Sequence, residues 1–476
     1  MTTDLALPLP GGGAQTGAGL RPGRFPDSGP LTGIRAWPPS PQPPHESRTA
    51  VRVVIATFPS TSHLYPVIPL AWALQSAGHE VRVVGHPGMG SDDMTATITG
   101  AGVPAVPVGE SVVGDSPRDE DEGAHLDIPA DAFALDVLDS DPRELRLLQD
   151  RLLSIISQCY PLDDTDKGMV PELIDFVRSY GPDLVLWDPL CLPAAVAARV
   201  AGAAHARILW GQDKLGWVWD RASRRSADRD PMARWMRPLL DRYGLTFTEE
   251  MLLGQWSVDL VPQAARLPLD TRTVPLRWVS YNEASVVPQW LREPAERPRV
   301  CLTLGVSSRH LFGKDIGFPL QDMLDTVAGL DVEVVATLNQ AQLTGLDRIP
   351  DNVRVVDFVP LNQLLPTCSA IVHHGGWGTF SVAAQHRVPQ IILPVPSWDE
   401  RVAARYIRDR GAGPLLDPAA LTPEELRRQL LSALNDPERR AGADELLADR
   451  MAAPSATEIV PVLERLTRHH RRSPLG

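Results

Sequence analysis

Short apolar strands alternate with helices after residue 50, and this alternation limits the fold more than any other feature. Residues 51–56 (VRVVIA) form an apolar, β-branched run, and residues 81–84 (VRVV) form a second one. The segment between them, residues 66–77, has helical character and ends at Gly78. A strand, a helix and a strand joined by short loops are typical of a βαβ unit, whose strands pair in parallel. We therefore predict an α/β fold with a parallel sheet, which a further strand at 181–187 extends.

A second series of the same kind begins near Arg299. Its expected strands are residues 300–304, 332–338, 370–373 and 390–393, and its first expected helix is residues 318–329. Between the two series, residues 262–297 are rich in proline and polar residues, which is the composition of a linker. A chain of 476 residues can hold two or three domains, each with its own core. We expect an N-terminal domain at 51–265, a linker at 266–298 and a C-terminal domain at 299–454.

Composition and charge exclude several classes of function. The chain has 46 basic and 59 acidic residues and a net charge of −13, which argues against nucleic acid as its partner. No apolar run reaches the ~18 residues that a membrane-spanning helix requires, so no membrane partner is expected. The four cysteines form no CxxC pair. They favour buried thiols in a reducing compartment over a zinc site or disulfides, and we expect a cytoplasmic protein.

The first 50 residues differ from the rest of the chain. They hold ten prolines and eight glycines and show no sustained hydrophobic period, so we predict a disordered extension. The start of the chain, from Met1 to Gly13, has no Lys or Arg, which argues against a signal peptide. Such a segment cannot bury enough apolar surface to offset its ordering entropy, and we expect it to be dispensable. Two origins stay open, a native tail or a natural start at Val51.

The sharpest functional signal is the run HHGGWGT at residues 373–379. It follows an apolar strand and opens a helix, and glycines at such a turn allow main-chain N–H groups to approach an anion. His374 and Thr379 can add side-chain donors, so we predict a phosphate site. The run matches neither the Rossmann fingerprint nor the P-loop, and the simpler alternative is a tight turn with two surface histidines.

Three further side chains are expected at the carboxyl ends of strands, where open α/β sheets bind ligands. Asp399 and Glu400 follow the strand at 390–393 and suit the hydroxyl groups of a sugar, although a helix N-terminus alone also favours such a pair. His63 lies in the loop after the first strand, in the other domain. It can face the phosphate site across a cleft as a general base, or it can be structural.

At this point the chain from Val51 to about Glu464 resembles the nucleotide-sugar glycosyltransferases of family 1, which have the GT-B fold. It looks most like the actinomycete, activator-dependent enzymes that attach deoxysugars such as desosamine or mycaminose to macrolide and related polyketide aglycones. The segments that carry the resemblance are residues 62–74, 78–84, 207–211, 254–256, 301–308, 349–353, 358–360, 364–368 and the turn at 373–379.

The resemblance implies two Rossmann-like domains that face each other across a cleft, with a last helix at 455–470 that returns to the N-terminal domain. His63 matches the catalytic base, and Asp136 and Asp139 are the candidates for the carboxylate that orients it. The residues that match donor-binding positions are Ser307, His374, Gly376, Gly378 and Thr379 at the diphosphate, Phe358 and Val359 at the nucleobase, and Asp399 and Glu400 at the sugar.

The implied reaction is an inverting, metal-independent transfer of a deoxysugar from a TDP-sugar, without a cofactor, to a hydroxyl group of a polyketide aglycone. A cytochrome-P450-like activator is the implied protein partner. Trp377 stands where relatives usually carry a small residue or Pro, and we expect it to narrow the phosphate entrance. Asp399 and Glu400 lack the Gln of many glucosyl-transferring relatives, which disfavours a glucose donor.

Two DxD triplets, residues 164–166 and 228–230, are interpreted as solvated surface and not as a metal site. Three alternative functions stay open from the sequence: an antibiotic-inactivating UDP-glucose transferase, a nucleotide-sugar 2-epimerase, and a catalytically idle partner subunit.

Overall fold

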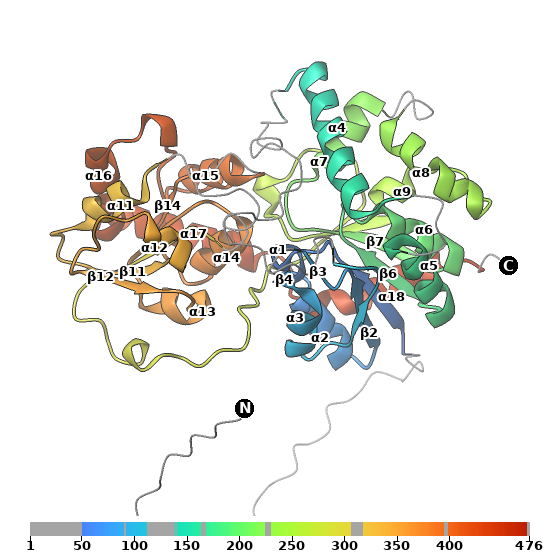
Figure 1. The fold of residues 1–476 in the computed structure, drawn as a ribbon, viewed down its shortest axis with the longest axis horizontal. Coiled ribbons are helices and arrows are strands. Elements are labelled where there is room, and N and C mark those ends of the chain that lie inside the picture. Colours follow the sequence, from blue (N-terminus) through green and yellow to red (C-terminus); the bar gives the residue numbers. More distant parts are fainter. Residues whose placement is uncertain are drawn as a thin grey trace, which may run out of the picture. The chain divides into compact units, whose positions relative to one another are not determined.

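The computed structural model describes residues 50–89, 92–111, 138, 140–162, 168–223, 230–305, 318–394 and 398–473. Residues 50–476 form one compact unit. Two parallel sheets lie in this unit, each flanked by helices, as Figure 1 shows. The predicted α/β class with two parallel-sheet domains is therefore confirmed.

The first sheet has seven strands in the order β5-β2-β1-β6-β7-β8-β9. These strands are β1 (Arg52–Ala56), β2 (Glu80–Gly85), β5 (Ala105–Pro107), β6 (Leu184–Trp187), β7 (Ala204–Leu209), β8 (Trp256–Asp259) and β9 (Thr273–Pro275). The helices in the same part of the chain are α1 (Thr61–Leu64), α2 (Ile68–Ser76), α3 (Met94–Gly100), α4 (Pro142–Cys159), α5 (Met169–Tyr180), α6 (Leu192–Ala201), α7 (Lys214–Val218), α8 (Pro231–Arg242) and α9 (Glu250–Leu253). A short antiparallel pair, β3 (Gly88–Met89) and β4 (Asp92–Asp93), lies beside α3.

The second sheet has five strands in the order β12-β11-β10-β13-β14. These strands are β10 (Arg299–Thr303), β11 (Glu333–Thr337), β12 (Val353–Val356), β13 (Ala370–His373) and β14 (Gln390–Ile392). The helices that follow in this part of the chain are α11 (Leu320–Val327), α12 (Gln340–Thr344), α13 (Leu361–Leu364), α14 (Trp377–Gln385), α15 (Glu400–Asp409), α16 (Pro423–Asn435), α17 (Pro437–Met451) and α18 (Ala456–His470).

Burial on both faces explains why β1 reads as a continuous apolar run instead of an alternating one. Val54 and Ala56 belong to one hydrophobic cluster of the first domain, and Val53 and Ile55 belong to the other. Helices cover both faces of the sheet, so that every inward position of the strand needs an apolar side chain. The β-branched residues of this run therefore specify a central strand.

The strand order of each sheet reverses direction at one place, and these two places position the site. In the first sheet the reversal lies between β1 and β6, which are neighbours although over a hundred residues separate them in sequence. In the second sheet it lies between β10 and β13. Loops diverge at such a switch point and leave a crevice at the carboxyl ends of the strands, where ligands bind.

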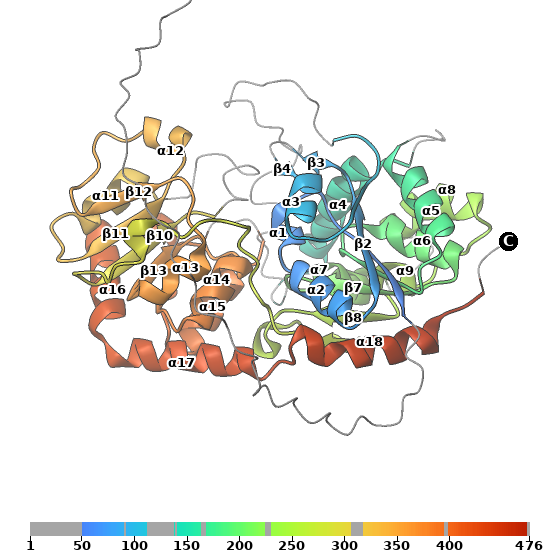
Figure 2. The ribbon, with the colours of Figure 1, turned by 90° about the horizontal axis from the view of Figure 1, so that it is seen from below.

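The linker expected at 266–298 contains a strand. Thr273–Pro275 pairs with β8 at the edge of the first sheet, where a proline is tolerated because one side of the strand has no partner. The chain crosses back after α17, and α18 lies along the first domain against α2, as Figure 2 shows. Ile459, Val460 and Leu463 of α18 are buried there, and Glu464 Oε1 lies 3.2 Å from His79 Nε2.

One DxD triplet is only partly described, and its described member is not solvated. Asp230 is buried, accepts from the main-chain N–H of Ala233 and from Gln149, and caps α8. The interpretation of this residue as solvated surface is therefore wrong, because the helix start needs its carboxylate. Asp164, Asp166 and Asp228 lie outside the described residues. Within the described ranges no helix is long and apolar enough to cross a membrane.

Candidate active site

A cavity of about 410 Å³ opens at the carboxyl ends of both sheets. The first domain contributes loops that follow β1, β6 and β7. The second domain contributes loops that follow β10, β12, β13 and β14, together with Thr337 at the end of β11. Residues 278–283 of the connecting segment complete the wall. The two switch points thus face one shared space, which is the arrangement that a reaction between two bound substrates requires.

His63 lies in α1, at the carboxyl end of β1, and lines this cavity. Its Nδ1 is 2.7 Å from Asp188 Oδ2, and the side chain is buried between the rings of Phe58 and Trp210. A carboxylate partner at Nδ1 selects the tautomer that carries its proton there. The lone pair then lies on Nε2, and the pair can act as a general base.

Asp188 is a site residue that the sequence analysis missed. It follows β6 directly, and its Oδ1 accepts from the main-chain N–H of Leu190 at 2.9 Å. Because β6 is the neighbour of β1, the two carboxyl ends bring the carboxylate to His63. The position of Asp188 at the end of an apolar strand could have identified it. The carboxylates named from the sequence, Asp136 and Asp139, lie outside the described residues.

The glycine turn after β13 holds the ring of His374. A Cβ at Gly305 would lie 2.2 Å from His374 Cε1, and one at Gly376 would lie 2.6 Å from His374 Nε2. Gly375 has φ = +107°, a conformation that side chains rarely adopt. Side chains at Gly305 and Gly376 would displace the imidazole, whereas a Cβ at Gly375 would lie 2.9 Å from Ile392 Cγ2 and 3.0 Å from Glu400 Cβ.

The same turn presents the start of α14 to the cavity. Gly376 caps the helix without a side-chain hydrogen bond, and Gly378 and Thr379 lie in its first turn on the cavity wall. Main-chain N–H groups of an uncapped helix N-terminus, with the helix dipole behind them, are suited to an anion. The preceding His373 is different: it is fully buried against Gln390, and burial lowers its pKa to about 3.

The expected nucleobase residues, Phe358 and Val359, also line the cavity. Phe358 and Val359 follow β12, and the Phe358 side chain is 51% exposed, which is unusual for a large apolar ring. An exposed ring on a cavity wall is available for stacking against a planar ligand. Ser307, expected near the phosphates, lies outside the described residues.

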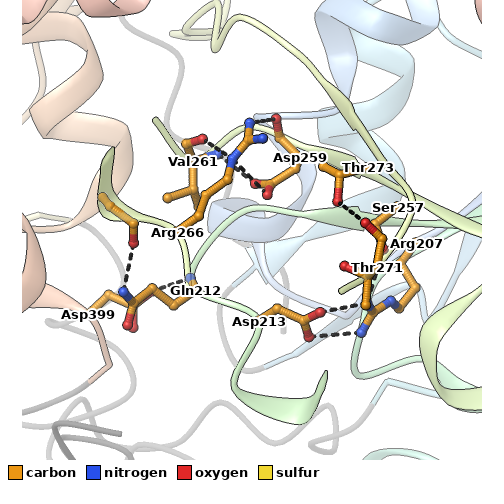
Figure 3. A network of polar contacts seen from close by, with 11 residues as sticks. Arg207, Gln212, Asp213, Ser257, Asp259, Val261, Arg266, Thr271, Thr273 and Asp399 are labelled. Atoms are coloured by element: carbon orange, nitrogen blue, oxygen red, sulfur yellow. Dashed lines mark hydrogen bonds and ion pairs between the residues drawn. The ribbon is translucent and has the colours of Figure 1, made fainter. Parts of the chain in front are cut away.

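Asp399 lines the cavity but is already bonded to the first domain. Its Oδ2 accepts from the main-chain N–H of Gln212 at 2.6 Å, and its Oδ1 pairs with Lys214 Nζ at 3.1 Å. Figure 3 shows Asp399 beside Gln212, with Arg207 and Asp213 bonded to each other nearby. This carboxylate joins the two domains, a role that the sequence does not reveal.

Trp377 also donates to Asp399, with its Nε1 3.1 Å from Oδ2. Only 6% of the Trp377 residue is exposed. Trp377 lines the cavity, and its ring packs edge-on against Phe380 with 5.2 Å between the ring centroids. A large residue fits here because its indole N–H has a buried carboxylate as partner.

Glu400 is the first residue of α15, and it also lines the cavity. Its Oε2 accepts from the main-chain N–H of Trp398 at 2.5 Å. Burial raises the pKa of Glu400 to about 7, and the neighbouring Asp399 acts in the same direction. A carboxyl group in this state can donate as well as accept a hydrogen bond, which suits a sugar hydroxyl.

Comparison with known proteins assigns this arrangement to a family. The N-terminal and C-terminal domain models described as "Erythromycin biosynthesis protein CIII-like" match residues 72–305 and 321–466. The chain belongs to this family. The chain is similar to 10-deoxymethynolide desosaminyltransferase of Streptomyces venezuelae, with 44% identity over 89% of this chain and 99% of that one. Tylactone mycaminosyltransferase of Streptomyces fradiae is 39% identical over 90% of this chain and 95% of that one.

Solved structures agree with the family on the fold. Glycosyltransferase VinC in complex with dTDP is 35% identical, and it covers 88% of this chain and 100% of its own with a TM-score of 0.75. Spinosyn forosaminyltransferase SpnP is 34% identical with the same coverage and a TM-score of 0.70. The resemblance read from the sequence is thus confirmed, and the chain is a glycosyltransferase of the GT-B fold.

Proposed function

We propose that this glycosyltransferase moves a deoxysugar from a TDP-sugar to a hydroxyl group of a macrolide-type polyketide aglycone, as a step of antibiotic biosynthesis. The names of the similar enzymes support the proposal, since they transfer desosamine to 10-deoxymethynolide and mycaminose to tylactone. The dTDP bound by the similar VinC supports the nucleotide. The observation in this chain that carries the proposal is a His–Asp pair facing an uncapped helix N-terminus across one cavity.

The acceptor side of the proposed reaction uses His63. Its Nε2 takes the proton from the aglycone hydroxyl while Asp188 holds the ring and stabilises the positive charge that forms. The hydroxyl oxygen attacks C1 of the sugar as the bond from C1 to the diphosphate oxygen breaks. This is one displacement, so the configuration at C1 inverts and no covalent enzyme intermediate forms.

The donor side uses the turn after β13. The N–H groups at the start of α14, with Thr379 and His374, receive the charge that develops on the departing diphosphate. Ser307 assists at the same phosphates, and Phe358 and Val359 hold the nucleobase. Glu400 contacts the sugar hydroxyls, with Asp399 placed beside it by Gln212 and Lys214.

No metal and no cofactor takes part in this proposal, because helix dipole and imidazole donors meet the diphosphate charge. A P450-like activator protein is the proposed partner, and the cytoplasm the proposed location. The activator rests on analogy with the sequence family alone.

The decisive experiment incubates the purified protein with TDP-desosamine or TDP-mycaminose and a macrolactone, with and without an activator protein and with and without EDTA. We expect a monoglycosylated macrolactone by mass spectrometry, more of it with the activator, and an equal amount with EDTA. Transfer from UDP-glucose to a finished macrolide, or an epimerised donor without acceptor, would contradict the proposal. Rescue of an EDTA-treated sample by Mg²⁺ would contradict the metal-free mechanism.

A further inference from the structure

Trp210 lies against both members of the His–Asp pair. Its Nε1–H donates to Asp188 Oδ2 at 2.9 Å, and the same oxygen meets His63 Nδ1 at 2.7 Å. The centroid of the nearest Trp210 ring is 4.0 Å from that of the imidazole, tilted by 56°. One side chain therefore touches the carboxylate by a hydrogen bond and the base by its ring.

We propose that Trp210 is a positioning residue for the catalytic base. A carboxylate can rotate about its Cβ–Cγ bond, and the main-chain N–H of Leu190 fixes only Oδ1 of Asp188. The indole N–H fixes Oδ2, so that both oxygens of the Asp188 carboxylate are held and the carboxylate cannot rotate away from the imidazole. The indole face then limits tilting of the ring, which keeps Nε2 aimed at the acceptor.

The loop that carries Trp210 is itself rigid. Trp210 follows β7, and three residues later Asp213 forms a two-bonded pair with the buried Arg207, at 2.8 and 2.6 Å. Asp213 also caps α7 by accepting from Gly216 N. A bidentate arginine–carboxylate pair fixes direction as well as distance, so that the loop holds Trp210 in place independently of substrate.

Trp210 also reaches the nucleotide domain. Its ring centroid lies 5.3 Å from that of Trp398, which precedes Asp399 and Glu400. Lys214, from the first domain, donates to the carbonyl oxygen of Trp398 at 2.5 Å. The indole that orients the base thus rests on the segment of the second domain that holds the two donor-site carboxylates.

The test uses Trp210→Phe, which keeps a ring against His63 but removes the N–H donor. We expect kcat to fall about 10–100-fold, as for one lost hydrogen bond to a charged group, with the KM for TDP-sugar within about twofold of wild type. The acid limb of the pH–kcat profile moves to higher pH, because a carboxylate without its indole donor stabilises protonated imidazole more strongly.

The matched control is Trp219→Phe. Trp219 is buried in the same domain and donates its indole N–H to Glu249 at 2.9 Å, outside the cavity. The control loses the same type of bond, so it should lower the melting temperature to a similar degree without changing kcat or the pH profile. Equal loss of kcat in both variants would overturn the proposal, because it would mark a general effect of stability.

A double-mutant cycle separates positioning from packing. If Trp210 acts through Asp188, the double variant Trp210→Phe with Asp188→Asn should be no slower than Asp188→Asn alone. If the double variant instead loses kcat by the product of the two single losses, the residues act independently and the proposal is overturned. Should Trp210→Phe not fold, Trp210→Leu also removes the N–H donor while it keeps an apolar side chain, and the same cycle with Asp188→Asn decides.

This inference rests on the proposed role of His63, and the two can fail separately. A His63→Ala variant with nearly full turnover would overturn the base itself. An inactive His63→Ala beside a fully active Trp210→Phe would leave the base in place and overturn only the role of Trp210.

Discussion

The two switch points of this enzyme have the same topology but supply different chemistry. Between β1 and β6 the first sheet presents side chains, an imidazole with its carboxylate, fixed by other side chains and one main-chain N–H. Between β10 and β13 the second sheet presents main-chain N–H groups and a helix start, with glycines that make room for one imidazole. A proton acceptor needs a group that titrates, whereas a leaving diphosphate needs fixed dipoles. The comparison predicts that substitutions at the switch point of the first sheet lower kcat, whereas substitutions at the switch point of the second sheet lower the affinity for the nucleotide.

The largest effect is expected from His63→Ala. Loss of a general base costs about 10²–10⁴-fold in kcat, while the affinity for TDP stays near wild type because His63 belongs to the other domain. Quenched turnover assays with saturating donor measure kcat, and calorimetry with TDP measures the affinity. A tenfold weaker TDP affinity in His63→Ala would contradict the assignment of nucleotide binding to the second switch point alone.

Lys214→Met tests the contact that joins the domains. Only 1% of Lys214 is exposed, and its removal leaves the Asp399 carboxylate buried without its cation. The expected loss of unfolding free energy is about 3–5 kcal/mol by denaturant titration, partly restored in the double variant with Asp399→Asn. The exposed pair Arg428–Glu425 is the control, and Arg428→Met should cost about 1 kcal/mol or less. Similar losses of unfolding free energy in Lys214→Met and Arg428→Met would show that the buried pair contributes no more than an exposed one.

His374→Ala should weaken TDP binding itself, by about 1.5–3 kcal/mol, for one lost hydrogen bond to a charged ligand. Calorimetry with TDP alone isolates the effect from the acceptor. His386→Ala, at the other end of α14, is the matched control and should leave the affinity unchanged. An unchanged affinity in His374→Ala would remove this ring from the diphosphate site.

The smallest effect concerns Glu400 and depends on pH. Burial raises the pKa of Glu400 to about 7, so the folded protein keeps this carboxyl group protonated up to about that pH. Its contribution to stability is complete below the unfolded pKa, near 4.3, and is lost as the pH rises through 7. Glu400→Gln should therefore gain stability relative to wild type as the pH rises from about 5 to about 8. A difference in melting temperature between Glu400→Gln and wild type that stays the same across this pH range would contradict the raised pKa.

Sequence reasoning finds the fold and the separate halves of the site for physical reasons. Strands buried on both faces, such as β1, appear in the sequence as a continuous apolar run. The glycine turn after β13 indicates an anion site because glycines between a strand and a helix allow main-chain N–H groups to approach a ligand. Asp188 was missed because it lies 125 residues from His63, and only the neighbouring positions of β1 and β6 bring them together. The pairing of Lys214 with Asp399 depends on how two domains meet, which no local pattern records. The three-residue β9 is too short to show a period.

The two polypeptide crossings between the domains lie side by side. Arg277 of the connecting segment donates its main-chain N–H to Pro454 O at 2.7 Å and its Nε to Ala453 O at 3.0 Å, so the outgoing and returning chains are tied together before α18 begins. Two adjacent crossings define a hinge line instead of a loose tether. A rotation of one domain against the other about that line would leave both crossings intact, but it would have to break the bonds that Asp399 makes with Gln212 and Lys214. The two crossings therefore limit the directions in which the domains can separate, and the contacts of Asp399 determine how easily they do so.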